Sequence, residues 1–216
     1  MFYLENNLYN LAVARRSIRK FKETPVPHED IEYFISCAVN APSGCNSQCW
    51  HFVAVENKAL IEKLAEETAK SAREFYGTGF TEANEEFLIS REKATSFFKN
   101  APLVIFVFLD RMDYYDERVS KAFSGKDFSK REMLDALAYP DILSVGAAVQ
   151  NMLLAITEKG YGACWMNDPV VGEPKIKTLL NVRDDLRLIS VVPIGVPNYI
   201  PRGKKLRSMS EVIEYR

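Results

Sequence analysis

Residues 140–159 read PDILSVGAAVQNMLLAITEK and predict a helix at the centre of the molecule. A helix that is apolar all round is buried all round. In a chain of 216 residues, such a helix lies in the core or is covered by a second subunit. Gly160, directly after it, suits a left-handed cap. The apolar positions are Ile142, Leu143, Val145, Ala147, Ala148, Val149, Met152, Leu153, Leu154 and Ile156.

Two further helices are predicted within the first half of the chain. Residues 27–40 place Ile31, Phe34 and Ala38 on one face of a 3.6-residue repeat. Residues 58–75 predict a charged helix. Residues 75–98 are rich in aromatic side chains and predict a helical excursion. It could act as a lid, and ordinary core and surface aromatic residues explain the same composition.

The strands are short and scattered between these helices. Residues 103–109 (LVIFVFL) form a continuous apolar run, which is typical of a strand buried on both faces. Further strands are expected at 51–56, 163–166 and 186–194, and polar surface structure at 113–130. Because strands and helices alternate irregularly, we predict a helix-rich α+β fold around one mixed sheet.

The composition predicts one cytoplasmic domain. With 47% hydrophobic residues, the chain can build one core, so residues 1–216 form a single domain and 197–216 an extension over a partner. The net charge of -1 argues against a nucleic-acid or anionic-membrane partner. Four cysteines are too few to staple a secreted domain, no signal peptide is visible, and charged or polar residues interrupt every apolar run.

Two clusters of cations could bind an anion. Residues 15–19 (RRSIR) place three guanidiniums and a hydroxyl within five positions, and arginine offers paired donors to phosphate oxygens. Residues 201–207 (PRGKKLR) place four cations within six positions. Either cluster could also be solvated surface. The absence of interleaved aromatic residues in the second cluster argues against single-stranded nucleic acid.

A loop at 41–48 (APSGCNSQ) carries small and polar residues that break the helical pattern. The side-chain amides of Asn46 and Gln48 and the backbone donors suit the polar edge of a planar heterocycle. An ordinary helix-to-strand connection explains the same residues. Cys45, Cys49 and His51 fit no common zinc spacing, so we expect no metal, although a redox pair of Cys45 and Cys49 stays open.

These segments together resemble the nitroreductase family over nearly the whole chain. The matching motifs, in order, are RRSIRKF at 15–21, APSGCNSQCW at 41–50, GYGACW at 160–165 and KLR at 205–207. The resemblance implies a central, mixed but mainly antiparallel sheet surrounded by helices, in an intertwined homodimer. No dinucleotide-binding G-x-G-x-x-G, P-loop or G-x-S-x-G motif competes with it.

The resemblance implies a cofactor site for FMN. By it, Arg15, Lys205 and Arg207 hold the FMN phosphate, and Arg16 and Ser17 contact the phosphate or the ribityl chain.

Further along the flavin, the resemblance places Arg19 near the pyrimidine edge, where a cation stabilises the reduced cofactor. It places the backbone around Met166 and Asn167 opposite the flavin N5. Lys93 is a candidate for one more flavin contact from the middle of the chain.

The second subunit is expected to supply the rest of the site. Pro42, Ser43 and Asn46 come from its loop, which Gln48 helps to shape. Relatives often carry proline where this chain has Cys49, so the loop is expected to be less rigid here.

The activity that the resemblance implies is a ping-pong oxidoreduction. NADH or NADPH reduces FMN and leaves, and an electron-poor small molecule such as a nitroaromatic or a quinone then takes the electrons. The flavin carries the chemistry, so no side chain is expected to be catalytic. Alternatives are reductive dehalogenation or flavin breakdown on the same fold, a non-catalytic FMN-binding redox sensor, and a nucleic-acid binder.

Overall fold

The computed structural model describes residues 8–80, 84–110, 132 and 135–216. The predicted surface segment at 113–130 lies outside the described residues. Four strands form one sheet in the order β1-β2-β4-β3, and every pair in it is antiparallel. An isolated parallel bridge between Ser17 and Ala163 adds a fifth segment at the β3 edge. The strands are β1 (Trp50–Val55), β2 (Leu103–Leu109), β3 (Gly162–Ala163) and β4 (Arg187–Gly195).

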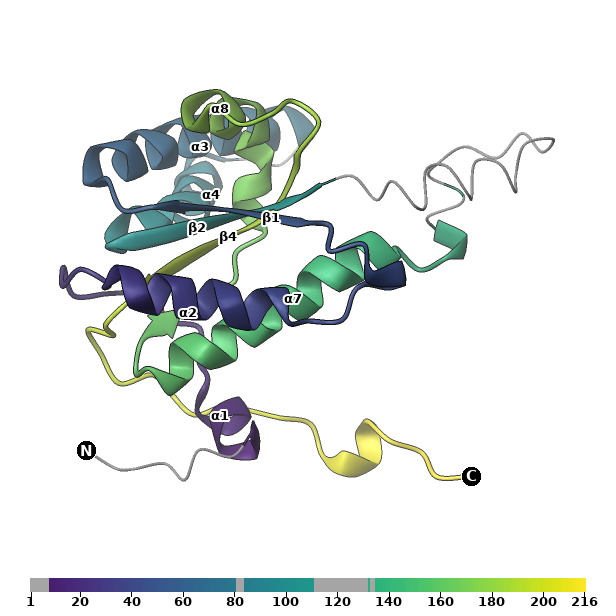
Figure 1. Cartoon of the computed structure of the whole chain (residues 1–216). Helices are drawn as coiled ribbons and strands as arrows, with labels where there is room; N and C mark the ends of the chain where they lie inside the picture. Colours follow the sequence, from purple (N-terminus) through teal and green to yellow (C-terminus); the bar gives the residue numbers. More distant parts are fainter. Residues whose placement is uncertain (1–7, 81–83, 111–131, 133–134) are drawn as a thin grey trace.

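Helices cover both faces of the sheet (Figure 1). One face carries α2 (His28–Val39) and α7 (Pro140–Glu158). The other carries α3 (Lys58–Gly79), α4 (Glu85–Ser96) and α8 (Glu173–Leu180). The predicted α+β fold is therefore confirmed. The remaining described helices are α1 (Leu8–Ala14) and the 3-10 turns η1 (Gly44–Asn46), η2 (Phe97–Asn100), η3 (Asp168–Gly172) and η4 (Met209–Glu211).

Strand β2 lies at the centre of the layers, as its continuous apolar run predicts. Its first six residues are fully buried, alternately against the two helical layers. A strand with both faces covered needs no polar positions.

Helix α7 is the core helix of the lower layer. Nine of its residues are buried, and Gly160 after it has φ +81°, which confirms the predicted left-handed cap. Among the described residues, α7 is the one helix that is long and apolar enough to cross a bilayer. Half of its most apolar stretch is buried inside the molecule, as in the core helix of a globular fold.

Its remaining surface has a regular spacing. Leu143, Ala147, Gln150, Leu154 and Thr157 are partly or fully exposed and follow one another at alternating steps of four and three. That spacing forms one straight stripe along a helix, the geometry of a helix-packing seam. We call these five residues the α7 seam.

Three element boundaries differ from the sequence prediction. Helix α3 continues to Gly79, and the aromatic excursion turns back as the separate helix α4. The strand predicted at 163–166 shortens to β3. The chain still follows β4, because Cys164 N donates to Pro193 O and Met166 exchanges two bonds with Val191. Pro193 has no N–H to return, so the ladder is incomplete there.

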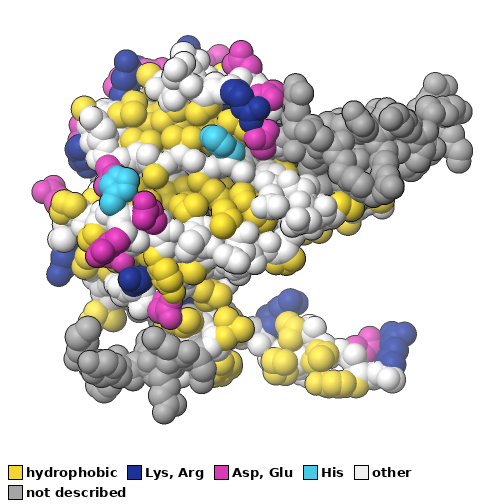
Figure 2. All heavy atoms as spheres, in the orientation of Figure 1, with side chains coloured by type: hydrophobic (Ala, Val, Ile, Leu, Met, Phe, Trp, Pro, Cys, Tyr) yellow, Lys and Arg dark blue, Asp and Glu magenta, His cyan; other side chains and the backbone are white. Residues whose placement is uncertain are grey.

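The C-terminal residues after Pro201 form an arm along the side of the molecule that carries α1 (Figure 1). Figure 2 shows hydrophobic side chains gathered on this arm. Leu206 is 79% exposed and Met209 69% exposed. A capping box between Ser208 and Glu211 closes the short turn η4.

Candidate functional site

Two segments from opposite ends of the chain lie side by side and antiparallel. Lys22 N donates to Val196 O at 2.8 Å, and Asn198 N donates to Lys20 O at 3.1 Å. Farther along, Lys204 Nζ donates to Ala12 O at 2.6 Å. We call residues 15–22 and 196–207 the basic ribbon. The fold thus joins the two cation clusters of the sequence into one surface.

The ribbon is fixed to the sheet at Gly162. Ile18 N donates to Ala163 O at 2.9 Å, beside the parallel bridge of Ser17. A Cβ on Gly162 would lie 2.5 Å from Ile18 Cγ1 and 2.8 Å from Ile18 Cβ. Only glycine permits this approach, so Gly162 of the GYGACW motif lets the ribbon lie against β3.

Arg15, Arg16 and Lys204 form a group of cations. Partial burial lowers the pKa of Lys204, and the guanidiniums of Arg15 and Arg16 lower it further. In the described part of the chain no carboxylate lies within 4 Å of any of the three. Like charges held together without a counter-ion favour binding of an anion.

Arg16 has a structural task in this group. Its guanidinium donates to Val13 O, to Arg15 O at 2.9 Å and to Arg202 O at 3.3 Å. The side chain therefore caps the end of α1 and holds the C-terminal segment, while Arg15 has no such carbonyl partner among the residues that the structure describes.

Ser17 and Arg19 lie beside the buried thiol of Cys164. Burial raises the pKa of Cys164, and the charge of Arg19, a hydrogen bond with Ser17 and the charge of Arg15 oppose that rise. These three ribbon residues thus border one spot at the β3 edge. A thiol with a raised pKa stays protonated and unreactive at neutral pH.

Met166 and Asn167 continue from this spot along β4. Met166 is buried and exchanges backbone hydrogen bonds with Val191 at 3.0 and 2.9 Å. Asn167 Nδ2 donates to Ile189 O at 2.9 Å. Both residues are held against the sheet, so their backbone position does not depend on a ligand.

The loop with Pro42, Ser43, Asn46 and Gln48 lies at the other end of α7. Gly44 N donates to Ser144 Oγ at 3.0 Å, and Gln48 N donates to Ser43 Oγ at 3.0 Å. Cys45, Asn46 and Gln48 have φ of 54°, 55° and 47°. Non-glycine residues seldom adopt this left-handed conformation, and it is typical of functional loops.

The two sets of predicted residues are therefore far apart within one chain. The loop is bonded to Ser144, which lies near the start of α7. The ribbon is bonded to Ala163, which follows the end of α7. The fourteen steps from Ser144 to Glu158 span about 20 Å at 1.5 Å per residue.

The two loop cysteines differ in accessibility. Cys45 is exposed and Cys49 is 1% exposed, and burial raises the pKa of Cys49. All four cysteines are free. Among the described residues no group of three or more His, Cys, Asp and Glu side chains could hold a metal ion.

The C-terminal cations Lys204, Lys205 and Arg207 are all exposed. Lys204, which the sequence did not single out, is the one whose pKa the charges of Arg15 and Arg16 lower, and the assignment of Lys205 and Arg207 to the phosphate stays a prediction. The four cations at 202–207 signalled the cluster, and which side chain lies near Arg15 depends on the path of the arm. Lys93 is exposed in the last turn of α4.

The predicted aromatic excursion forms a ring cluster where α3 meets α4. Tyr76 contacts three other rings, with centroids 5.2 Å from Phe75, 5.5 Å from Phe80 and 5.9 Å from Phe87. Arg91 lies over the Tyr76 ring, and its Nη1 is 3.8 Å from Oδ2 of Asp168, the residue after Asn167. The cluster is thus linked to the segment beside β4.

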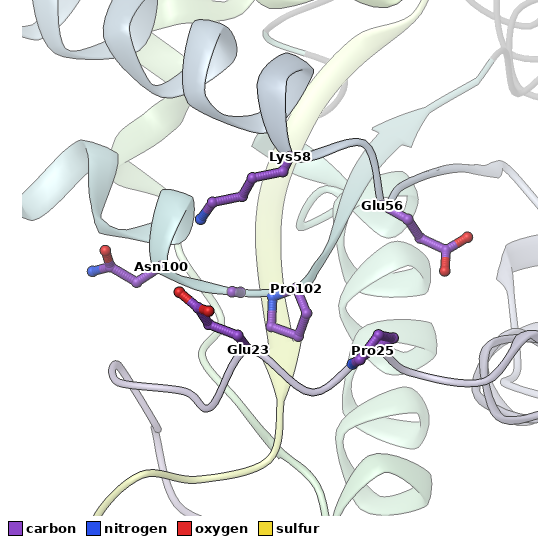
Figure 3. Close-up of a pocket in the computed structure, with 7 residues that line it drawn as sticks. Glu23, Pro25, Glu56, Lys58, Asn100 and Pro102 are labelled. Atoms are coloured by element: carbon purple, nitrogen blue, oxygen red, sulfur yellow. The ribbon is translucent and has the colours of Figure 1, made fainter.

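A separate hollow of about 280 Å³ lies where β1 ends and β2 begins (Figure 3). In Figure 3 its floor is formed by Pro102, and the side chains of Glu23, Lys58 and Asn100 surround it. None of the predicted site residues lines it. Its two carboxylates, from Glu23 and Glu56, would repel a phosphate.

The fold and the ribbon define a class: an α+β protein with one sheet between two helical layers and a cluster of cations at the sheet's edge. A family model described as the nitroreductase family matches residues 12–196. The chain belongs to that family.

The relatives within the family carry different names. An iodotyrosine deiodinase from Thermotoga neapolitana is 30% identical over 88% of this chain and 89% of its own length. A BluB-like flavoprotein from Clostridium difficile is 27% identical, with a TM-score of 0.84 over 97% of this chain and 99% of its own. A nitroreductase with bound FMN from Bacteroides fragilis, 20% identical, shares the fold with a TM-score of 0.70 over 97% and 100% of the two chains.

Proposed function

We propose that this protein is an FMN-dependent oxidoreductase that takes electrons from NADH or NADPH and passes them to an electron-poor small molecule. The observation that carries the proposal is the cation group of Arg15 and Lys204 beside Ser17 and Arg19, with no carboxylate within 4 Å of the two cations in the described residues. A family structure with bound FMN has the same fold.

The residues present fit FMN. Its phosphate is a dianion, and the group offers a guanidinium and an ammonium without a competing carboxylate within 4 Å in the described residues. Gly162 lets the ribbon lie against β3, which brings Ser17 and Arg19 within reach of the same ligand. Lys205 and Arg207 would complete the phosphate site if the arm closes on it.

A homodimer would assemble the complete site. The α7 seam runs from Leu143 to Thr157, and Gln150 is its midpoint. Two copies packed antiparallel along this seam, about a two-fold axis at Gln150, place the start of one α7 beside the end of the other. The loop with Pro42, Ser43, Asn46 and Gln48 then lies next to the ribbon of the other copy. One chain alone keeps them about 20 Å apart.

The C-terminal arm fits the same assembly. Its exposed apolar side chains have no cover within the described residues, and we propose that residues 197–216 lie over the second copy. The single domain at 1–216 and a cytoplasmic location remain the sequence-based expectation.

Bound FMN supplies the two-electron chemistry, and the chain supplies position and charge. Arg19 would hold positive charge near the pyrimidine edge of a bound flavin and so favour the reduced cofactor. Met166 and Asn167 are bonded to β4, so their backbone groups would face a bound flavin from a fixed position. The ring cluster around Tyr76 offers planar acceptors such as nitroaromatics or quinones a stacking surface, with Phe80 50% exposed.

Reductive dehalogenation is the second candidate, because a relative at 30% identity is an iodotyrosine deiodinase. In that reaction two electrons and a proton replace an aryl C–I bond by C–H and release iodide. The same cofactor site serves both reactions, so the acceptor alone distinguishes them.

The test is the visible spectrum of the FMN-reconstituted protein, followed by anaerobic addition of NADH or NADPH. Bleaching of protein-bound flavin is the expected result. Mixing the reduced protein with nitrobenzoate or with iodotyrosine then identifies the acceptor by which one restores the oxidised spectrum. Absence of bound flavin would refute the proposal, and bound flavin that neither nucleotide reduces would favour a redox sensor.

A further inference from the structure

The backbone pairing that holds the basic ribbon against the sheet is short. Ile18 N donates to Ala163 O at 2.9 Å, and Ser17 pairs with Ala163 in the parallel bridge. On its other edge, β3 pairs with β4 through two residues, Gly162 and Ala163. We call these two residues the ribbon seat. The place of the ribbon cations therefore depends on where the turn after α7 delivers the seat.

One carboxylate on α2 bonds to both sides of that turn. Tyr161 Oη donates to Asp30 Oδ2 at 2.8 Å, and Lys159 Nζ lies 3.0 Å from Asp30 Oδ1. Lys159 and Tyr161 flank Gly160, whose left-handed conformation ends α7, and Tyr161 directly precedes the seat. The Asp30 side chain is 13% exposed. Asp30 thus ties the turn to α2 on both sides of its glycine.

The same face of α2 makes two further contacts with this region. Asp30, Tyr33 and Phe34 are spaced i, i+3 and i+4, so they lie on one side of the helix. The Phe34 ring packs edge-on against Tyr161, with the ring centroids 5.7 Å apart. Tyr33 donates to the carboxylate of Glu158, the last residue of α7. Three contacts from one helix therefore hold the end of α7 and the turn in one arrangement.

The charge states of the contact keep it closed at neutral pH. Hydrogen bonds from Lys159 and Tyr161 lower the pKa of Asp30, against the opposing effect of burial, and the charge of Lys159 lowers it further. Burial and the hydrogen bond to Asp30 raise the pKa of Tyr161 to about 12, with the charges of Asp30 and Glu29 adding to the rise. The carboxylate is therefore charged at neutral pH, and the phenol keeps its proton.

We propose that Asp30 is a positioning residue of the cofactor site: through Tyr161 and Lys159 it sets the ribbon seat, and with it the place of the ribbon cations. Asp30 lies on α2, outside the ribbon and the 41–48 loop. Its effect passes from Tyr161 to the adjoining seat, and from the seat to the ribbon. The effect on the ribbon is a property of the fold, whereas the effect on cofactor binding rests on the proposed function.

The first measurement is amide hydrogen exchange of the full chain without FMN, read by mass spectrometry of peptides. Asp30→Ala removes both bonds, and Tyr161→Phe removes the hydroxyl but keeps the ring against Phe34. Exchange is accelerated only at amides whose opening breaks the removed contact. In either variant, exchange at 15–22 should therefore be about tenfold faster, with no change at 85–96 in α4. The double variant should match Asp30→Ala, because the two groups form one bond.

Glu85→Ala is the matched control. Glu85 is also a carboxylate in the first turn of a helix, and it bonds to Arg73 of a neighbouring helix on the other face of the sheet. Its loss removes the same favourable contact with a helix dipole. Exchange should become faster at 85–96 in this variant and stay unchanged at 15–22.

Flavin titration of the same variants tests the effect on the cofactor site. Riboflavin lacks the phosphate, so the ratio of FMN affinity to riboflavin affinity measures what the ribbon cations contribute. Asp30→Ala and Tyr161→Phe should lower this ratio roughly fivefold, because displaced cations bind the phosphate less well. Glu85→Ala should leave the ratio unchanged. A general loss of stability would weaken both ligands alike.

Four outcomes would overturn the inference: unchanged exchange at 15–22, equal acceleration at 15–22 and 85–96 in Asp30→Ala, a double variant whose effect is the sum of the single effects, or an unchanged FMN-to-riboflavin ratio. If Asp30→Ala does not fold, Tyr161→Phe carries the test, because it keeps the packed ring. A parent protein that binds no flavin, with exchange at 15–22 still dependent on Asp30, would refute the proposed function and leave the control of the ribbon by Asp30 in place.

Discussion

The basic ribbon and the 41–48 loop, the two halves of the proposed cofactor site, are built by opposite means. The ribbon joins residues about 180 positions apart in sequence and is held by backbone bonds to β3 and by Gly162. The loop keeps left-handed backbone angles at Cys45, Asn46 and Gln48, and its backbone donates to the hydroxyls of Ser144 and Ser43. Charge is therefore positioned by backbone pairing with the sheet, whereas the polar loop depends on bonds to side-chain hydroxyls.

The α7 seam, across which the proposed dimer brings the ribbon of one copy to the loop of the other, is tested first. Leu154→Glu puts a charge into the α7 seam without touching the ribbon or the loop. We expect the proposed dimer to dissociate, because an unpaired carboxylate in an apolar contact is strongly unfavourable, and FMN to be lost with it. Light scattering after size exclusion and the flavin absorbance of the same peak measure both. Ile89→Glu, on the exposed side of α4, is the control. A monomer that keeps FMN would show that one chain is enough.

Gly162→Val tests the seat of the ribbon. The new Cβ would need the space of Ile18, so either Ile18 moves or the ribbon leaves β3. We expect a loss of about 3 kcal/mol in the free energy of unfolding and a weaker FMN site. Urea unfolding of the FMN-free protein measures the first effect, and flavin titration measures the second. A Cβ on Gly79 would meet no atom within 4 Å, so Gly79→Val should be close to neutral; equal losses in both variants would contradict this account.

Arg15→Gln tests the charge of the ribbon with its fold intact. Loss of one charged hydrogen-bonding partner costs about 2 kcal/mol, so the FMN dissociation constant should rise roughly 30-fold. Lys58→Gln removes a cation on α3 and should change it little. Fluorescence titration of free FMN measures the constants. Equal affinity in the two variants would exclude Arg15 from the phosphate site.

The sequence could predict the core elements of the fold but not the pairing that forms the ribbon. The all-round apolarity of residues 140–159, the period of 27–40 and the run at 103–109 specify core elements, because burial dictates their composition. The lateral assembly of 15–22 with 196–204 has no local signal. It depends on Gly162 and on the path of a C-terminal segment that lacks its own core contacts.

The sequence could not predict the direction of single side chains on the C-terminal arm. Four cations at 202–207 marked the segment, but its irregular backbone has no period from which to deduce that Lys204 lies near Arg15. Helix α4 was missed as a separate element for a related reason. Its apolar residues do not gather on one face, and the helix is held to α3 by Arg73, which bonds to Glu85 and Glu92.

The smallest effect is expected in the loop. Ser144→Ala removes the acceptor of Gly44 N, and the hydroxyl's own bond to Pro140 O goes with it. A lost hydrogen bond of this kind costs about 1 kcal/mol. Since the loop has few other contacts, the cost should appear as faster FMN release, roughly fivefold, with a nearly unchanged unfolding midpoint. Stopped-flow release measures the rate, and Thr178→Ala, which loses a hydroxyl bonded to Pro174 O on α8, away from the α7 seam, is the control. If Ser144→Ala lowered the unfolding midpoint as much as Gly162→Val, the loop would be part of the core, and the contrast between the two halves would fail.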